Sequence, residues 1–161
     1  MWTPRTLTEA KLTRWGREIG KTAAAPLFLT LRGPLGAGKS VLARAVCQGA
    51  GVPGPIPSPT FNLLYRYPAR GGREVVHLDL FRIENPTELR ELGWDELGAP
   101  SEIVLVEWPE RAGDRLPTDR WDVEIQPVTD APEFREVRVT RVGAPHPLPA
   151  LPGPALDPRE A

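Results

Sequence analysis

The stretch Gly33-Pro34-Leu35-Gly36-Ala37-Gly38-Lys39-Ser40 constrains this chain more than any other segment. It follows a short apolar run at residues 27–32 and precedes residues 39–48, whose apolar positions recur at helical spacing. Such a G-x-x-x-x-G-K-[ST] loop between a strand and a helix is typical of phosphate binding, because glycines let several backbone N–H groups turn toward one anion. We expect the phosphates to be contacted by Leu35, Gly36, Ala37, Gly38, Lys39, Ser40 and Val41.

Lys39 and Ser40 bring side-chain chemistry to this loop. A lysine at this position reaches the outer phosphates of a nucleotide, and the following hydroxyl binds Mg²⁺. Only three of the chain's 20 basic residues are lysines. A chain that uses arginine almost everywhere has a lysine here, where a fork-shaped guanidinium would not do the same work. The sequence therefore predicts a nucleotide and Mg²⁺ as ligands.

Two acidic residues follow apolar runs and are candidates to work with that Mg²⁺. Asp79 ends the run at residues 75–79, and Glu107 follows the run at residues 103–106. A buried carboxylate is costly unless it is paired or lies near a metal, which favours a functional role for both. One would hold Mg²⁺ with Ser40 and the other would position the attacking water, and the sequence does not assign the two roles. His77 shares a strand face with Asp79, and we interpret it as a core histidine rather than a residue that orients the acid.

The remaining patterns predict one α/β domain over residues 1–143. We expect a P-loop NTPase-like fold whose mixed, mostly parallel sheet lies between helices and ends in an antiparallel strand pair. Residues 144–161 are rich in proline and are expected to form a disordered tail. The other expected elements are a helix at 6–22 that begins with a Thr6–Glu9 capping box, a hairpin of strands 61–67 and 74–80 turning at Gly71-Gly72, a helix at 86–92, and strands 103–106, 121–126 and 134–142.

Composition restricts the partners and the compartment. The formal net charge is −1, so the chain has no global positive field, and any contact with RNA or DNA would need a local patch or a protein partner. The single cysteine, Cys47, cannot form an internal disulfide, which fits a reducing compartment. No signal peptide pattern and no apolar run of about 20 residues is present. We therefore predict a cytoplasmic protein with no membrane contact.

The choice between ATP and GTP depends on a missing lysine. Proteins that bind GTP usually read guanine with an Asn-Lys-x-Asp motif, and no lysine follows Lys39. The segment Asp95-Glu96-Leu97-Gly98 resembles the D-x-x-G of GTPases, but no apolar strand precedes it. ATP is therefore the expected nucleotide.

Four segments in order make the chain resemble the TsaE (YjeE) family of small bacterial P-loop ATPases, which are needed to make threonylcarbamoyladenosine in tRNA. The family's loop reads G-D-L-G-A-G-K-T, and this chain has Gly33–Ser40 there. The other matching segments are Ser58-Pro59-Thr60-Phe61, His77-Leu78-Asp79-Leu80-Phe81-Arg82 and Glu107-Trp108-Pro109-Glu110-Arg111. The loop alone is generic, whereas the ordered set of four is specific.

The resemblance implies a slow Mg²⁺-dependent ATPase that acts on the TsaB–TsaD complex and resets it between turnovers. It also implies that tRNA is reached only indirectly, through these partners. It implies Mg²⁺ held by Ser40 and Glu107, and Asp79 in the hydrolytic site. Ser58–Phe61 would form a switch-like segment, with Thr60 reaching Mg²⁺ or phosphate. It also places Glu9 and Arg135 near the nucleotide. Glu9 would be able to serve both the capping box and the nucleotide, whereas Arg135 fits a solvated strand residue equally well.

Two other functions remain open from the sequence. The chain would be a small-molecule kinase if Arg111, Arg115 and Arg120 formed a lid over a transferred phosphoryl group, although solvated loop charges explain them more simply. Alternatively, it would be a binding module that holds ATP without hydrolysing it. That second alternative predicts unchanged function when Asp79 or Glu107 is replaced.

Overall fold

One mixed β-sheet organises the molecule. The computed structural model describes residues 1–56 and 63–153, and in them the sheet has seven strands in the order β1-β7-β6-β2-β5-β4-β3. The central strands β2, β4, β5 and β6 pair in parallel, and antiparallel pairs lie at both sides. The predicted α/β class with an antiparallel pair at its end is confirmed. The strands span Arg5–Thr8 (β1), Leu27–Arg32 (β2), Leu64–Pro68 (β3), Glu74–Asp79 (β4), Glu102–Glu107 (β5), Arg120–Val128 (β6) and Ala131–Val142 (β7).

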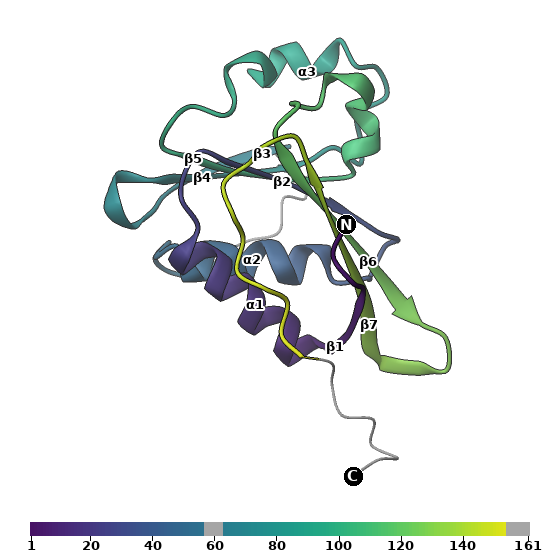
Figure 1. Ribbon diagram of the computed structural model, residues 1–161. Coiled ribbons are helices and arrows are strands. Elements are labelled where there is room, and N and C mark those ends of the chain that lie inside the picture. Colours follow the sequence, from purple (N-terminus) through teal and green to yellow (C-terminus); the bar gives the residue numbers. More distant parts are fainter. Residues whose placement is uncertain (57–62, 154–161) are drawn as a thin grey trace.

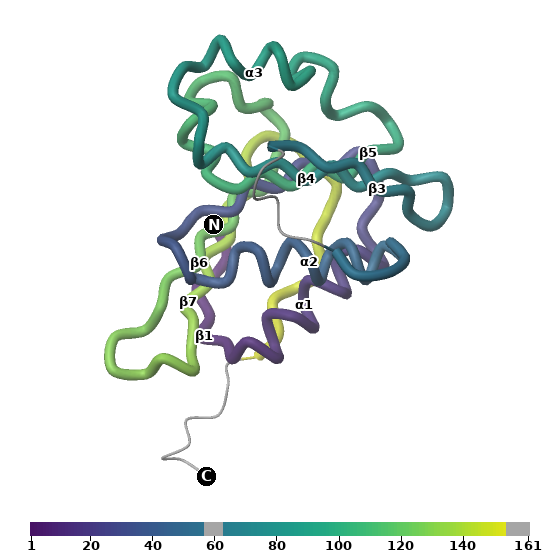
Figure 2. Tube along the Cα trace, turned by 180° about the vertical axis from the view of Figure 1, so that it is seen from behind, coloured from purple at the N-terminus to yellow at the C-terminus, as the bar shows by residue number. Residues whose placement is uncertain are grey.

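Helices cover both faces of this sheet (Figure 1). Helix α1 (Glu9–Thr22) and helix α2 (Lys39–Gly49) lie side by side on one face, as the reverse view in Figure 2 also shows. The other face carries the links from β4 to β5 and from β5 to β6. Those links contain the short helix α3 (Glu88–Glu91) and the 3₁₀ turns η2 (Trp94–Glu96), η3 (Pro109–Arg111) and η4 (Gly113–Arg115). No helix in the described part of the chain is long and apolar enough to cross a membrane.

Strand alternation divides the core into two layers. Leu29, Val75 and Leu105 face α1 and α2, whereas Phe28, Val76 and Val104 face the α3 side. In the same alternation His77, Asp79 and Glu107 fall on the face of α1 and α2. This places the polar residues at the ends of β4 and β5 on the side where α2 begins.

The two helices pack unusually closely because glycines face each other at their contact. A Cβ added at Gly20 would lie 2.0 Å from the Val46 carbonyl oxygen, and one at Gly49 would lie 2.0 Å from the Arg17 carbonyl oxygen. Only glycine therefore permits this helix spacing. The contact fixes α1 against α2 and so against the loop that precedes α2.

The first helix begins later than the sequence predicts. Residues Arg5–Thr8 form β1, which pairs antiparallel with β7, so the predicted helical start at residue 6 and the Thr6–Glu9 capping box are wrong. Thr8 is the N-cap instead, and its Oγ1 accepts a hydrogen bond from the Lys11 N–H at 3.3 Å. The sheet edge of β7 offers this segment more backbone hydrogen bonds than one extra helical turn would.

Residues 144–153 are ordered against the domain, which corrects the predicted disordered tail in this range. They run past α2 and along α1 (Figure 1), with Leu148 and Leu151 buried. The indoles of Trp121 and Trp15 donate to the carbonyls of His146 and Pro149, at 2.8 Å and 2.9 Å. Prolines restrict the unfolded chain, so ordering this segment costs little conformational entropy. Two indole hydrogen bonds and two buried leucines are therefore enough to hold it. Residues 154–161 lie outside the described residues.

The hairpin pairing and the second helix agree with expectation, but the first hairpin strand begins at Leu64 rather than at residue 61, and residues 61 and 62 lie outside the described residues. β3 and β4 pair antiparallel, and the 3₁₀ turn η1 (Arg70–Gly72) joins them at the predicted glycines. Helix α2 spans the predicted residues and one more. The short helix α3 covers only the middle of the predicted 86–92.

Candidate active site

The loop between β2 and α2 has the conformation that its glycines predict. Gly33, Gly36 and Gly38 have φ angles of +145°, +78° and +115°, a region that side chains with a Cβ rarely adopt. A Cβ on Gly33 would also lie 2.2 Å from the Ile125 carbonyl oxygen. Gly38 is the N-cap of α2 and has no side chain to bond the first N–H groups of the helix. The loop therefore presents backbone donors and a helix N-terminus in one place, the arrangement that attracts phosphate.

Lys39 is buried at the start of α2 and is held by the loop itself. Its Nζ donates to the carbonyl oxygens of Gly33 and Pro34, and it lies 3.6 Å from the ring centre of Trp108. Burial lowers the pKa of Lys39 from its ordinary value, and the carboxylates of Glu107, Glu110 and Asp79 oppose that shift. An anion in the loop would compensate this desolvated cation.

Trp108 also belongs to this site, although its sequence context alone gives it no role. Its backbone has φ +58°, in the left-handed region, where the chain leaves β5 before Pro109. That turn lays the indole against the Lys39 ammonium, a cation–π contact. The sequence signal was the Glu107-Trp108-Pro109 segment, but only the strand register reveals that it lies against the loop.

The Glu107 carboxylate joins the loop to the neighbouring strand. Ser40 Oγ donates to Glu107 Oε1 at 3.0 Å, and His77 Nε2 lies 2.7 Å from Glu107 Oε2. Both members of the His77–Glu107 pair are buried, with side chains 2% and 3% exposed. Because an ionised carboxylate only accepts hydrogen bonds, Nε2 of His77 carries the proton. His77 therefore orients an acid, but the acid is Glu107 on β5 and not Asp79 on its own strand.

We expect His77→Leu to lower the free energy of unfolding by about 1.5–3 kcal/mol, because a buried carboxylate loses its hydrogen-bond donor. His77→Gln should recover most of that loss, because its amide N–H can occupy the Nε2 position. Urea unfolding of the three proteins measures both effects. A Leu variant as stable as the parent, or a Gln variant as unstable as Leu, would contradict the assigned hydrogen bond.

Asp79 ends β4 directly beside Glu107, since the two Cα positions pair in the parallel register. Its Oδ1 accepts the Phe81 N–H at 2.9 Å. Burial raises the pKa of Asp79 above its ordinary value; the Glu107 carboxylate raises it further, while the Phe81 hydrogen bond and the charges of His77 and Lys39 lower it. The two acids that the sequence offers as partners of one Mg²⁺ therefore end neighbouring parallel strands.

Because the fold raises the pKa of Asp79, ionised Asp79 lowers the free energy of unfolding. A carboxyl with a folded pKa above its unfolded pKa stabilises the fold at low pH and loses that contribution as pH rises through the folded pKa. Asp79→Asn stays neutral and keeps an oxygen for the Phe81 N–H, so it should melt at a higher temperature than the parent at pH 7.5. The difference should vanish below about pH 4, near the ordinary aspartate pKa. Melting curves at both pH values test this, with exposed Asp95→Asn as control; a destabilised Asp79→Asn at pH 7.5 contradicts it.

The donor set fits Mg²⁺. The Ser40 hydroxyl and the Glu107 carboxylate are the hard oxygen ligands that Mg²⁺ prefers, and they already lie within hydrogen-bond distance of each other. The described residues contain no group of three or more His, Cys, Asp or Glu side chains with metal-binding geometry. Mg²⁺ commonly takes one or two protein ligands and completes its shell with water and substrate phosphates. Ser40 and Glu107 would be those protein ligands.

The remaining predicted residues lie at different distances from this centre. Arg135 on β7 reaches the loop, where its Nε donates to the Ala37 carbonyl oxygen at 2.8 Å. Glu9 is exposed at the first position of α1, one turn before Leu12, whose side chain faces Gly38. Leu35 is exposed at the tip of the loop. Thr60 and the rest of Ser58–Phe61 lie outside the described residues. The nucleotide roles of Glu9, Arg135 and Thr60 stay predictions.

The arginines that a kinase lid would need are engaged elsewhere. Arg111 donates to the Ile83 carbonyl oxygen at 3.2 Å, and Arg115 donates to that of Pro86. Arg120 bonds the Pro117 carbonyl oxygen and pairs with Asp122 at 2.9 Å. These contacts hold the loops of the α3 side together and do not gather the guanidinium groups over the phosphate loop.

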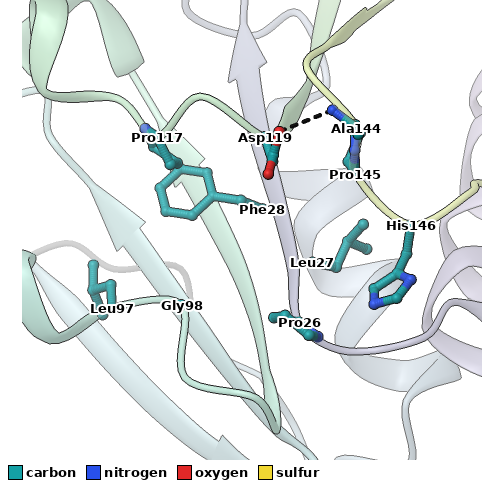
Figure 3. A pocket seen from close by; sticks show the side chains of 10 residues that line it. All are labelled: Pro26, Leu27, Phe28, Leu97, Gly98, Pro117, Asp119, Ala144, Pro145 and His146. Carbon is teal, nitrogen blue, oxygen red and sulfur yellow. Dashed lines mark hydrogen bonds between the residues drawn. The ribbon is translucent and has the colours of Figure 1, made fainter.

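A separate hollow of about 390 Å³ lies at the opposite end of β2 from the loop (Figure 3). Its wall includes Phe28 and Leu27 at the beginning of β2, and the ordered segment after β7 closes it through a hydrogen bond from the Ala144 N–H to Asp119 at 2.9 Å. None of the predicted site residues lines it. The residues around it are Pro26, Leu27, Phe28, Leu97, Gly98, Pro117, Asp119, Ala144, Pro145 and His146.

A mixed sheet with a glycine loop between its central strand and a helix, and with two acids at the neighbouring strand ends, defines an α/β protein of the P-loop class. Residues 6–137 match the family model described as "Threonylcarbamoyl adenosine biosynthesis protein TsaE". The chain therefore belongs to the TsaE family. This matches the resemblance that the four sequence segments indicated.

Several proteins named TsaE are similar in sequence to this chain over most of its length. A TsaE protein of Streptomyces coelicolor is 36% identical over 132 residues, which are 80% of this chain and 88% of the relative. One of Haemophilus influenzae is 34% identical over 73% of each chain, and one of Bacillus subtilis is 35% identical over 71% of this chain and 70% of its own. Each is named as a tRNA threonylcarbamoyladenosine biosynthesis protein. The crystal structure of YdiB from Bacillus subtilis superposes with a TM-score of 0.69 at 26% identity, over 89% of this chain and 88% of that one.

Proposed function

We propose that this protein binds ATP with Mg²⁺ at the Gly33–Ser40 loop, hydrolyses it slowly, and thereby supports threonylcarbamoyladenosine formation in tRNA by acting on the TsaB–TsaD complex. The observation that carries the proposal is the contact of Ser40 and His77 with opposite oxygens of Glu107, beside a buried Lys39. Family membership supplies the pathway. The partner complex comes from the family resemblance.

The residues of the chain would divide the work as follows. The loop N–H groups and Lys39 bind and orient the phosphates, and Ser40 with Glu107 holds the metal. Mg²⁺, when bound, neutralises phosphate charge and favours departure of the leaving group. Asp79, with its raised pKa, accepts a hydrogen bond from the attacking water and positions it in line. His77 keeps the Glu107 carboxylate in one orientation.

Slow hydrolysis follows from what this arrangement contains. Fast P-loop enzymes place a cation on the transferred phosphoryl group, often an arginine supplied by a partner. On the α3 side Arg111 and Arg115 are bonded to carbonyl oxygens, and Arg135 bonds the loop backbone. A partner that adds or releases a cation at the loop would accelerate hydrolysis. The TsaB–TsaD complex would in this way control when ATP is hydrolysed.

The direct test measures ATP hydrolysis with and without purified TsaB–TsaD complex. Stimulation by the complex that is absent in Lys39→Ala is expected, and equal rates in both conditions would contradict action on this complex. Depletion of the protein should also lower threonylcarbamoyladenosine in bulk tRNA, and the parent but not Lys39→Ala should restore it. Unchanged modification after complete depletion would overturn the pathway assignment.

A further inference from the structure

The net charge of −1 conceals a strong separation of charge across the sheet. Helices α1 and α2 together carry six basic and two acidic residues. The links on the opposite face, residues 80–101 and 108–119, carry four basic and eight acidic residues. Figure 1 shows these two groups on opposite sides of the sheet. The molecule therefore has a basic face and an acidic face, which an overall count does not reveal.

The basic face contains a groove with four cations on its wall. Arg14, Arg17 and Lys21 follow one stripe of α1, and Arg70 of η1 closes the other side. The groove has a volume of about 610 Å³, and Glu18 is the acid among its lining residues. Because α1 rises about 1.5 Å per residue, the stripe from Arg14 to Lys21 is about 10 Å long, comparable with three phosphates of one nucleic-acid strand.

Two of these cations have no structural task within the described part of the chain. Arg17 Nε bonds Gln48 at 3.2 Å, and Arg70 bonds the Gly49 carbonyl oxygen at 3.2 Å, so both help to close the end of α2. Arg14 and Lys21 are exposed, and neither makes a hydrogen bond or ion pair to any residue that the structure describes. Helix capping therefore explains Arg17 and Arg70 but leaves Arg14 and Lys21 unexplained.

The lining favours nucleic acid over a protein partner. Protein interfaces are centred on aromatic and large apolar residues in desolvated pockets. This groove has only Ala10 and Gly49 between its charged side chains. Phosphate backbones, in contrast, are bound mainly by arginine and lysine, with little need for apolar area.

We propose that this basic face of α1, with Arg70, is a contact surface for the phosphodiester backbone of RNA. It lies along the outer side of α1, away from the Gly33–Ser40 loop, so RNA and nucleotide would occupy separate sites. The binding is sequence-independent and electrostatic, and it acts in addition to any contact that a protein partner makes with tRNA.

Fluorescence anisotropy with a labelled RNA duplex and with an unmodified tRNA transcript, in the absence of nucleotide, tests the proposal. Four phosphate contacts predict a dissociation constant on the order of 10⁻⁵ M at low salt. They also predict binding about 150-fold weaker at 200 mM than at 50 mM salt. Because no nucleotide is present, failure of the ATPase proposal would not alter this result, and failure of RNA binding would not alter the ATPase assays.

The decisive variant is Arg14→Glu with Lys21→Glu, since neither side chain holds the fold together. It should bind RNA at least tenfold more weakly and with about half the salt dependence. Its matched control is Arg90→Glu with Arg141→Glu, which changes the net charge equally on exposed positions elsewhere and should bind like the parent. Absence of RNA binding at 50 mM salt, or an equal loss in both double variants, would overturn the proposal. The proposal would also be overturned if the parent bound no RNA and the Arg14→Glu, Lys21→Glu variant instead lost its stimulation by the TsaB–TsaD complex or its self-association.

Discussion

Lys39→Ala should abolish measurable ATP hydrolysis and weaken nucleotide affinity by about 10- to 150-fold. Lys39 is the buried cation of the loop, and a hydrogen bond to a charged group contributes about 1.5–3 kcal/mol. Its present partners are the carbonyl oxygens of Gly33 and Pro34, which compensate a cation less well than phosphate oxygens do. Calorimetric titration with ATP and ADP, with Mg²⁺ present, measures the loss.

The fold should survive this change, which makes the result interpretable. Removing Lys39 also removes a desolvated charge, which partly offsets the lost cation–π contact with Trp108, worth about 2 kcal/mol at a desolvated site. Lys39→Met keeps the length of the side chain without its charge and should lose affinity as well. Lys21 is an exposed lysine in the last turn of α1, and Lys21→Ala should bind nucleotide like the parent in the absence of RNA. Parent-like affinity in both Lys39 variants would mean that the loop does not bind phosphate through Lys39.

The chemistry of the loop was predictable because it depends on local sequence. Gly33, Gly38, Lys39 and Ser40 need particular residue types at fixed spacing, and the strand before them and the helix after them are read from short periodic patterns. The neighbourhood of Asp79 and Glu107 was also accessible, because the carboxyl ends of parallel strands meet at one edge of a sheet. These inferences need the order of elements but not their exact register.

Contacts that depend on register or on distant segments were not accessible in this way. The alternation of β4 places His77 on the face of Asp79, but its partner is Glu107 on β5, which only the pairing of the two strands reveals. Thr6 and Glu9 are suitable residues for a capping box. Residues 5–8 instead form backbone hydrogen bonds with β7, a distant strand that local helix propensity does not take into account. The segment 144–153 is held by the indoles of Trp15 and Trp121, more than twenty residues away in sequence. Charge separation is likewise invisible until the helices are placed on one face.

Glu107→Gln should remove the Mg²⁺ dependence of nucleotide binding and lower the hydrolysis rate by about 100- to 1,000-fold. The amide keeps the size of the carboxylate, with an oxygen to accept from His77 and an N–H to donate to Ser40, so the buried contacts stay satisfied. What is lost is the charge that holds the metal, and transition-state charge stabilisation of this kind is worth several kcal/mol. Affinity for ADP measured with EDTA should therefore equal that of the parent, while the gain on adding Mg²⁺ disappears.

Glu102→Gln is a close control, because Glu102 begins the strand that Glu107 ends and is also a buried glutamate. It accepts hydrogen bonds from Arg66 at 2.9 Å and from the Gly98 N–H at 2.9 Å, far from the loop. Its replacement should lower stability without changing the response to Mg²⁺. Glu107→Ala should in turn unfold more easily than Glu107→Gln by about 3–5 kcal/mol, since it leaves His77 and Ser40 without a buried partner. A Glu107→Gln protein that still gains affinity from Mg²⁺ would move the metal site to Asp79, the carboxylate beside it on β4.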